Sequence, residues 1–218
     1  MTLSVERRPQ IVEICQRHHV LILEDNPYGL LGFDGHLYPA MQPLNPEGII
    51  YLGSFSKMLA PGFRVGWALA PDQITEKLVI ANESAILCPA MASQMSISTY
   101  MREFDWYGQV DKFRVMYRSR SRACLQALAE YLPQCSWTTP VGGFYTWVQF
   151  PEGINTREML PRAIENLVAY VSGTAFYTDG RGADFVRLAF CYPPEAEIRE
   201  GVRRLAVTVE QELELLGR

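Results

Sequence analysis

Residues 51–67 of the chain read YLGSFSKMLAPGFRVGW, and this stretch is the most informative part of the sequence. It holds Lys57, one of three lysines in 218 residues, between two serines and a proline–glycine pair. An apolar run precedes this polar segment, and a second apolar run follows Arg64. Short apolar runs bounded by glycine and proline are typical of strands in α/β proteins. The stretch therefore predicts two strands joined by a loop that carries the lysine.

The composition is that of a globular protein with one large or two small domains. Hydrophobic residues make up 48% of the chain and charged residues 20%, which is enough apolar material for a sizeable core. A net charge of -4 and the absence of a basic run argue against nucleic acid as a partner. The arginines between Arg114 and Arg122 have helical spacing and fit a solvated helix face better than a phosphate-backbone site. No apolar run reaches the roughly 20 residues of a membrane span, and residues 1–10 lack the apolar core of a signal peptide.

The cysteines point to a reducing compartment. There are five of them, they lie far apart, and no two form a C-x-x-C pair: Cys15, Cys88, Cys124, Cys135 and Cys191. An odd number without metal-ligand spacing indicates free thiols. We therefore expect a cytoplasmic protein with neither a disulfide framework nor a metal site.

The apolar residues follow strand and helix patterns in alternation, which indicates an α/β fold. Apolar runs predict strands at residues 20–24, 48–54, 65–71, 142–150, 168–173 and 184–190. Helical spacing predicts helices at 10–19, from Asp72 to an interruption at Pro89, through 113–128, at 156–167 and at 195–216. Ser4 and Asp72 are candidate N-caps, and the first three strands are expected to be buried on both faces. A break near residue 105 would divide a sheet-bearing unit, 1–105, from a smaller α+β unit, 106–218.

An acidic residue ends the first predicted strand. In the segment LILEDNPYG, Asp25 follows the apolar run and precedes an Asn-Pro-Tyr-Gly turn. Ligands of open α/β sheets bind at the carboxyl ends of the strands, so Asp25 could direct its carboxylate into a site. Alternatively, its side chain caps the turn through local backbone hydrogen bonds.

Lys57 also lies just beyond the carboxyl end of a predicted strand. Ser54, Ser56 and the neighbouring backbone amides could bind an anion, and Arg64 supplies a positive charge suited to a phosphate. A poorly hydrated lysine beside another cation can act as an amine nucleophile, although a lone loop lysine is usually exposed and inert. A carboxylate, a lysine and phosphate ligands together are what a pyridoxal phosphate site requires.

Four segments together resemble the class I/II aminotransferases, which are fold-type I pyridoxal phosphate enzymes. They are EDNPYG, GSFSKMLAPGFRVGWALAP, PVGGFYTWVQFPEG and FVRLAFCYPP, and the block S-x-S-K-x-x-x-P-G-x-R-x-G-W is their most specific part. The nearest subgroup is that of the 2-aminoadipate and aromatic aminotransferases. The resemblance implies the C-terminal part of such an enzyme, with a partial large-domain sheet and an α+β small domain.

The resemblance also implies roles for individual residues. It implies a cofactor site made of Asp25, Tyr28, Ser54, Ser56, Lys57 and Arg64. Lys57 would hold the cofactor aldehyde as a Schiff base and shuttle the proton, and Asp25 would pair with the pyridine nitrogen. Tyr28 would contact the ring hydroxyl, while the remaining three groups bind the phosphate. Arg187 would clamp the substrate α-carboxylate. On the residues alone, Tyr28 could instead be a packing aromatic and Arg187 an exposed residue of an edge strand.

The resemblance covers only the later half of the family's usual length. The family's glycine-rich phosphate turn, the aromatic that stacks on the ring and an asparagine ligand would all precede residue 1. We therefore expect apolar sheet edges to be exposed, and a chain that is weak or inactive alone. A truncation, a wrong start and one part of a split protein all fit this pattern. The full-length form is expected to be a homodimer.

Three functions remain open at this stage. The first is amino group transfer between an L-amino acid and a 2-oxo acid. The second is an aminotransferase-like effector domain of a transcription regulator, which nothing within these residues separates from the first. The third takes Ser54 as the nucleophile of an S-x-x-K hydrolase. That mechanism needs a later K-T-G strand, and the other two lysines lie in TEKLV and VDKFR, so it is the weakest of the three.

Overall fold

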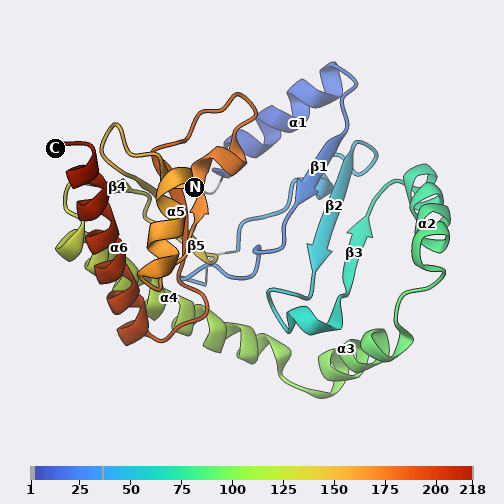
Figure 1. Cartoon of the computed structure of the whole chain (residues 1–218). Coiled ribbons are helices and arrows are strands. Elements are labelled where there is room, and N and C mark those ends of the chain that lie inside the picture. Colours follow the sequence, from blue (N-terminus) through green and yellow to red (C-terminus); the bar gives the residue numbers. More distant parts are fainter. Residues whose placement is uncertain (1–2, 36, 218) are drawn as a thin grey trace. The chain divides into compact units, whose positions relative to one another are not determined.

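The computed structural model describes residues 3–35 and 37–217 (Figure 1). The chain forms two compact units, the first ending at Arg114 and the second beginning at Val115. Each unit has its own sheet, and each is described by itself. Among the described residues, no helix combines the length and the apolar character that crossing a bilayer would require.

The first unit contains a three-stranded sheet and several helices. Its elements are α1 (Arg7–Arg17), β1 (Ile22–Asp25), η1 (Gln42–Leu44), β2 (Ile49–Ser54), η2 (Pro61–Phe63), β3 (Gly66–Leu69), α2 (Asp72–Ile86), α3 (Met91–Glu103) and the start of α4 (Trp106–Tyr131). The strand order is β1-β2-β3, with β2 parallel to β1 and antiparallel to β3. All three predicted strands and the break before Pro89 are confirmed.

The predicted burial of the first sheet is wrong. Of the four residues of β1 only Glu24 is buried, and every residue of β3 is exposed. Continuous apolar runs indicate strands covered on both faces, but the described residues cover neither face of β3 and leave Leu23 of β1 exposed. The run of apolar residues therefore predicted the strands correctly and their surroundings incorrectly.

Both predicted N-caps are also wrong. The N-cap position of α1 is held by Glu6, and that of α2 by Pro71, which leaves Asp72 as the first residue of its helix. Neither cap residue accepts a side-chain hydrogen bond at the helix start. An acidic side chain in the first turn still interacts favourably with the helix dipole, which explains Asp72 without a capping bond.

The second unit is an α+β structure with a four-stranded antiparallel sheet. It contains the rest of α4, β4 (Ser136–Trp137), β5 (Tyr145–Gln149), α5 (Thr156–Glu165), β6 (Val171–Ser172), η3 (Gly173–Phe176), β7 (Phe185–Ala189) and α6 (Glu195–Leu215). The strand order is β4-β5-β7-β6. All the strands predicted here, α5 and α6 are present with shorter bounds, α4 is longer than the predicted 113–128, and β4 was not predicted.

The core of the second unit lies between its sheet and its helices, where α5 and α6 pack side by side (Figure 1). Val148 of β5, Val186 of β7 and Leu205 of α6 are fully buried there. The start of α5 is fixed by Asn155, whose side-chain oxygen accepts hydrogen bonds from the backbone amides of Arg157 and Glu158. Asparagine is a favourable N-cap because it satisfies amides that lack partners in the helix.

Candidate active site

The first sheet brings two candidate cofactor ligands to one face. Asp25 is the last residue of β1, and Ser54 is the last residue of β2. The parallel register pairs Asp25 with Leu52, two positions before Ser54. Paired residues share a face, and side chains on one strand alternate between faces. Asp25 and Ser54 therefore lie on the same face, near the carboxyl ends of neighbouring parallel strands.

The loop after β2 folds back toward β3 around Lys57. The backbone amide of Ser56 donates to Ser54 Oγ at 3.1 Å, and that of Leu59 donates to the carbonyl of Phe55 at 2.9 Å. The Phe55 amide in turn donates to the carbonyl of Val65 at 3.1 Å. These bonds form a compact turn in which Lys57 is half-buried. The lysine is therefore on a short ordered segment next to the strand end.

Arg64 has an unusual backbone conformation. Its φ angle is +54°, in the left-handed region that residues other than glycine rarely adopt. The side chain is exposed, and Nη1 donates to the carbonyl of Pro61 at 3.3 Å. Such strain is frequent at ligand sites, where the surrounding structure holds it. Arg64 thus ends the Pro61–Phe63 turn and carries its guanidinium on the same loop as Lys57.

β1 is held in place from the face opposite Asp25. Buried Glu24 accepts hydrogen bonds from the backbone amides of Met41, at 2.9 Å, and Gln42, at 3.1 Å. Arg8 lies 3.6 Å from the same carboxylate and donates to the carbonyl of Pro39 at 2.7 Å. Because adjacent strand residues point to opposite faces, fixing Glu24 also fixes the direction of Asp25.

Tyr28 lies in the turn that follows β1. It is half-buried, and its carbonyl accepts a hydrogen bond from the Leu31 amide at 2.8 Å. The six candidate cofactor ligands, Asp25, Tyr28, Ser54, Ser56, Lys57 and Arg64, are all in the first unit.

A cavity of about 610 Å³ lies beside the first sheet, and its lining includes Tyr51 and Gly53 of β2 and Trp67 of β3. Asn26 Nδ2 donates to the hydroxyl of Tyr51 at 3.0 Å, and the Tyr51 ring stacks on Trp67 at 5.2 Å. Burial raises the pKa of the Tyr51 hydroxyl, and the hydrogen bond from Asn26 opposes this. The lining includes Ser54 but not Asp25, Lys57 or Arg64. Ser54 is therefore the one candidate cofactor ligand among the residues that line this cavity.

Arg187 has aromatic neighbours in the second unit. It lies in β7 opposite Trp147 of β5 and Val171 of β6, so β7 is an inner strand and the edge-strand alternative is wrong. Its guanidinium carbon is 4.3 Å from the ring centre of Tyr145 and 5.1 Å from that of Phe176. Nε is buried and has no hydrogen-bond partner within the described chain. A buried donor without a partner is unfavourable, and an anionic ligand could satisfy it by accepting a hydrogen bond from the guanidinium.

Tyr145 and Phe176 were not predicted from the sequence. The strand pattern could have indicated Tyr145. It lies two residues before Trp147 and so points to the same face of the sheet, and Trp147 is the residue paired with Arg187. Phe176 ends a short 3-10 helix after β6, and no local pattern connects it to Arg187.

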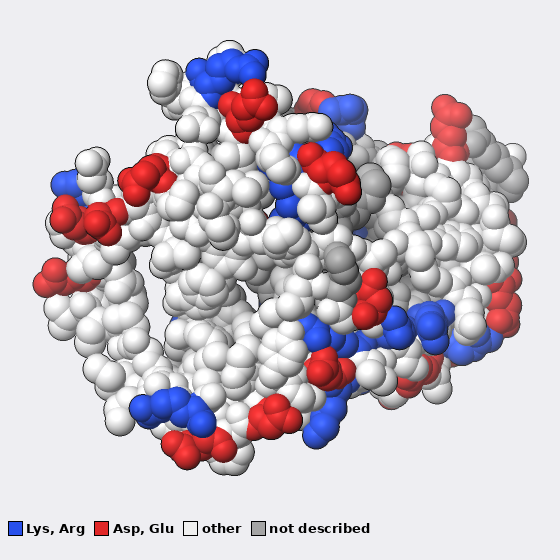
Figure 2. Space-filling model, turned by 180° about the vertical axis from the view of Figure 1, so that it is seen from behind, with Lys and Arg blue, Asp and Glu red and all other residues white. Residues whose placement is uncertain are grey.

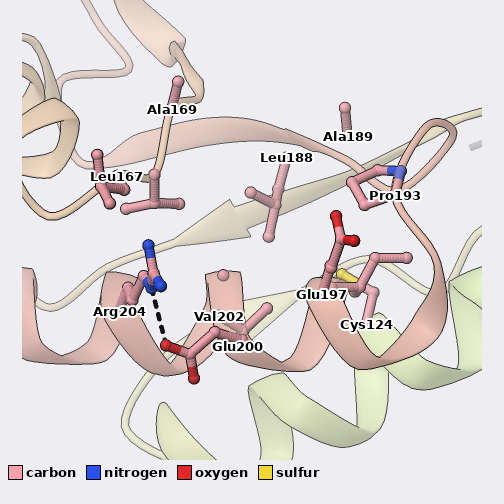
Figure 3. A pocket seen from close by; sticks show the side chains of 13 residues that line it. Cys124, Leu167, Ala169, Leu188, Ala189, Pro193, Glu197, Glu200, Val202 and Arg204 are labelled. Carbon is pink, nitrogen blue, oxygen red and sulfur yellow. Dashed lines mark hydrogen bonds and ion pairs between the residues drawn. The ribbon is translucent and has the colours of Figure 1, made fainter.

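A second cavity, of about 450 Å³, lies within the second unit (Figure 3). Its apolar wall includes Leu188 and Val202, and the ion pair between Glu200 and Arg204 lies at its side. Cys124 also lines it, and burial raises the pKa of this thiol to about 12. A thiol with such a pKa stays protonated near neutral pH and is a poor nucleophile. None of the predicted site residues lines this cavity.

The side chains of the first unit fit pyridoxal phosphate by their chemistry. A carboxylate suits a protonated ring nitrogen, an amine suits the aldehyde, and two hydroxyls with a guanidinium suit a phosphate dianion. The part of the chain that the structure describes contains no group of three or more side chains arranged to hold a metal ion. The donor set is thus suited to an organic phosphate cofactor.

A family model described as aminotransferase class I and II matches residues 2–205. The chain belongs to this family, whose members use pyridoxal phosphate. It is similar to aromatic-amino-acid aminotransferase 1 of Thermococcus litoralis, with 40% identity over 98% of this chain and 52% of the relative. The crystal structure of the α-aminoadipate aminotransferase of Thermus thermophilus, complexed with N-(5'-phosphopyridoxyl)-L-leucine, matches with a TM-score of 0.93 and 32% identity. That match covers 97% of this chain and 56% of the other.

The similarity extends to proteins described as regulators. An HTH-type transcriptional regulator of Bacillus subtilis is 26% identical over 96% of this chain and 43% of its own length. In each of these comparisons, the chain spans about half the length of its relative or less than that. The predicted family and fold are therefore confirmed.

Proposed function

We propose that this chain carries the lysine-bearing part of a pyridoxal phosphate-dependent aminotransferase that transfers an amino group between an L-amino acid and a 2-oxo acid. The observation that carries the proposal is the parallel pairing of β1 with β2, from whose carboxyl ends Asp25 and the Lys57 loop follow. The aminotransferases at 40% and 32% identity support it. The free state of all five cysteines agrees with a cytoplasmic setting.

The residues have separate tasks in this proposal. When bound, pyridoxal phosphate withdraws electrons from the bond broken at the substrate α-carbon. The Asp25 carboxylate would hold the proton on the ring nitrogen, and Tyr28 would donate to the ring hydroxyl. Ser54, Ser56 and Arg64 would bind the phosphate and keep the cofactor in one orientation. The Lys57 amine would hold the aldehyde carbon until the substrate amine displaces it, and the freed amine would then accept the proton from the substrate α-carbon.

Arg187 would bind the substrate α-carboxylate through its guanidinium. The stacking against Tyr145 and Phe176 holds the planar group in one orientation, and the unpaired buried Nε leaves donor capacity for an anion. The complete protein is expected to act as a homodimer, and the 218-residue chain alone to be weak or inactive.

Covalent trapping of the cofactor tests the role of Lys57. The chain is incubated with pyridoxal phosphate and reduced with borohydride, and its peptides are mapped by mass spectrometry. We expect the label on Lys57, its loss in Lys57→Ala and its retention in the matched control Lys112→Ala. Equal labelling of Lys57, Lys77 and Lys112 would contradict the proposal, and so would robust transamination by Lys57→Ala.

The regulator similarity supports a second candidate, an effector domain that binds the same cofactor. Both candidates predict labelling of Lys57, so turnover separates them. Transamination by the complete protein supports the enzyme. Cofactor binding without turnover, together with amino-acid-dependent binding to DNA, supports the effector domain.

A further inference from the structure

The cavity of about 450 Å³ in the second unit has no role in the proposed function, and we call it the Gly201 cavity (Figure 3). Its wall comes from the end of β7, from residues 167–169 between α5 and β6, from the first half of α6 and from Cys124. The described residues that line it do not include Arg187 or the two aromatic rings beside that residue. Its volume is within the range of small-molecule sites.

Gly201 leaves part of this cavity open. It lies in the interior of α6, where glycine is less favourable than alanine because its backbone loses more conformational freedom on folding. A Cβ placed on Gly201 would meet no heavy atom of the surrounding structure within 4 Å. Close packing therefore does not require glycine here, and an alanine would both fit and stabilise the helix.

Leu167 is unusual in the opposite way. It follows α5 at a turn in which the Val168 amide donates to the carbonyl of Ala163 at 2.9 Å, and its φ angle is +60°. Glycine is preferred at such helix ends because it adopts the left-handed conformation without strain. Leu167 instead carries that strain and leaves its apolar side chain 77% exposed beside the cavity. Two residues around one cavity thus depart from local backbone preferences, which is typical of functional sites.

The lining combines an apolar wall with three charged side chains. Leu188 and Val202 are buried and belong to the apolar part. Two of the charged groups neutralise each other, because Arg204 Nε donates to the Glu200 carboxylate at 2.8 Å. The third, Glu197, is exposed, and no ion pair within the described chain neutralises its carboxylate. The lining therefore has one uncompensated negative charge beside an apolar surface.

Local charges determine which ligands the cavity attracts. The chain has a formal net charge of only -4, and Figure 2 shows acidic and basic side chains interspersed over the face in view. A surface of mixed charge produces no strong field of one sign, so the nearest groups decide. The Glu197 carboxylate attracts a cation, and this attraction is stronger beside an apolar wall than in bulk water.

We propose that the Gly201 cavity binds a small organic cation, an apolar molecule with one protonated amine. The apolar body packs against Leu188 and Val202, in the space that a side chain at position 201 would fill. The amine forms an ion pair with the Glu197 carboxylate. Leu167 covers the bound molecule and thereby removes its own apolar side chain from water. The site shares no residue with the candidate cofactor and substrate ligands.

Binding of two probes of matched size to the purified chain tests the proposal. They are 2-phenylethylamine and 2-phenylethanol, which carry a cationic and a neutral group on the same apolar body. Neither has a carboxylate, so neither is a ligand for Arg187. Backbone amide shifts measured by NMR locate the site and give the dissociation constant. We expect about 1 mM or less for the amine and at least about threefold weaker binding of the alcohol. The shifted amides should be those of 167–169, 188–189 and 197–204.

Substitutions separate the two requirements of the site, open space and a negative charge. Gly201→Leu fills the space and should abolish saturable binding of the amine. Gly201→Ala should raise the thermal midpoint by about 2–4 degrees, because it improves the helix without a clash. Glu197→Gln should weaken binding of the amine by about threefold to fivefold and leave that of the alcohol unchanged. Glu210→Gln, on the same helix but outside the lining, is the matched control and should change neither affinity.

Three results would each overturn the proposal. The first is the absence of saturable amine binding to the unsubstituted chain. The second is a Gly201→Leu variant that is folded by circular dichroism and binds the amine as the unsubstituted chain does, which would place the amine elsewhere. The third is equal affinity for amine and alcohol, which would leave a cavity without selection for cations. All the measurements use the chain without pyridoxal phosphate, so their outcome is independent of the labelling of Lys57.

Discussion

The two units of the molecule are similar in length but place their apolar side chains differently. Of the buried apolar residues among the described positions, only five belong to the first unit: Val12, Leu31, Ile49, Ile97 and Val110. The second unit holds the rest, including Leu205 and Phe190. In its sheet Val148 and Val186 are fully buried, whereas every residue of β3 in the first unit is exposed. The second unit therefore has the larger buried core, and the first leaves more of its large apolar side chains exposed.

The largest expected effect comes from replacing one leucine by alanine in each unit and comparing the losses in free energy of unfolding. Leu205→Ala should lower the free energy of unfolding by about 2–5 kcal/mol, because it leaves a cavity at a fully buried site. Leu78→Ala should change it by about 0.5 kcal/mol or less, since Leu78 is exposed on a helix with no buried residue. Both positions are helical, so helix propensity cancels. Urea unfolding provides the measurement, and equal losses would remove the contrast between the units.

A smaller difference is expected from two matched tyrosine substitutions. Buried Tyr170 donates its hydroxyl to the carbonyl of Thr156 at 2.7 Å, whereas half-buried Tyr51 accepts from Asn26. Tyr170→Phe should cost about 1–2 kcal/mol, because water cannot readily replace the lost partner. Tyr51→Phe should cost about 0.5 kcal/mol or less, because solvent reaches that site. Thermal unfolding of both variants, with wild type as reference, measures the difference. A larger cost for Tyr51→Phe would mean that the first unit is better packed than its exposure indicates.

The same contrast explains how far the sequence could predict the fold. Strands and helices follow from local periodicity, and all the predicted elements are present. Burial depends on which other segments pack against a strand, and local periodicity does not reveal these. The apolar runs at 20–24 and 65–71 therefore predicted strands buried on both faces, whereas the strands are mostly exposed. The two-residue strand β4 was missed because so short a segment has no periodicity.

For the candidate site, too, the sequence could predict positions at strand ends but not the surroundings that depend on the tertiary structure. Asp25 and Lys57 could be placed from the sequence because Asp25 ends one strand and Lys57 lies just beyond another, and strand ends are determined locally. The surroundings of Arg187 could not, since Phe176 reaches it only through the tertiary structure. The buried pair of Arg8 and Glu24 was missed for the same reason, because its partners at Pro39 and Met41 lie in an irregular segment.

The smallest predicted effect is a pH dependence confined to the second unit. Hydrogen bonds from Arg203 and Arg204 lower the pKa of Glu200 to about 2, below the usual value near 4.3. A carboxylate with a lowered folded-state pKa stabilises the fold above its unfolded-state pKa, and this contribution is lost as the pH falls from about 4 toward 2. Glu200→Gln should therefore lower the thermal midpoint at pH 7 by at most about two degrees, since exposed ion pairs contribute little. Near pH 2 it should match wild type, and Glu197→Gln, on the same helix, is the control. A Glu200→Gln deficit that persisted at pH 2 would show that the side chain stabilises α6 by packing and not by charge.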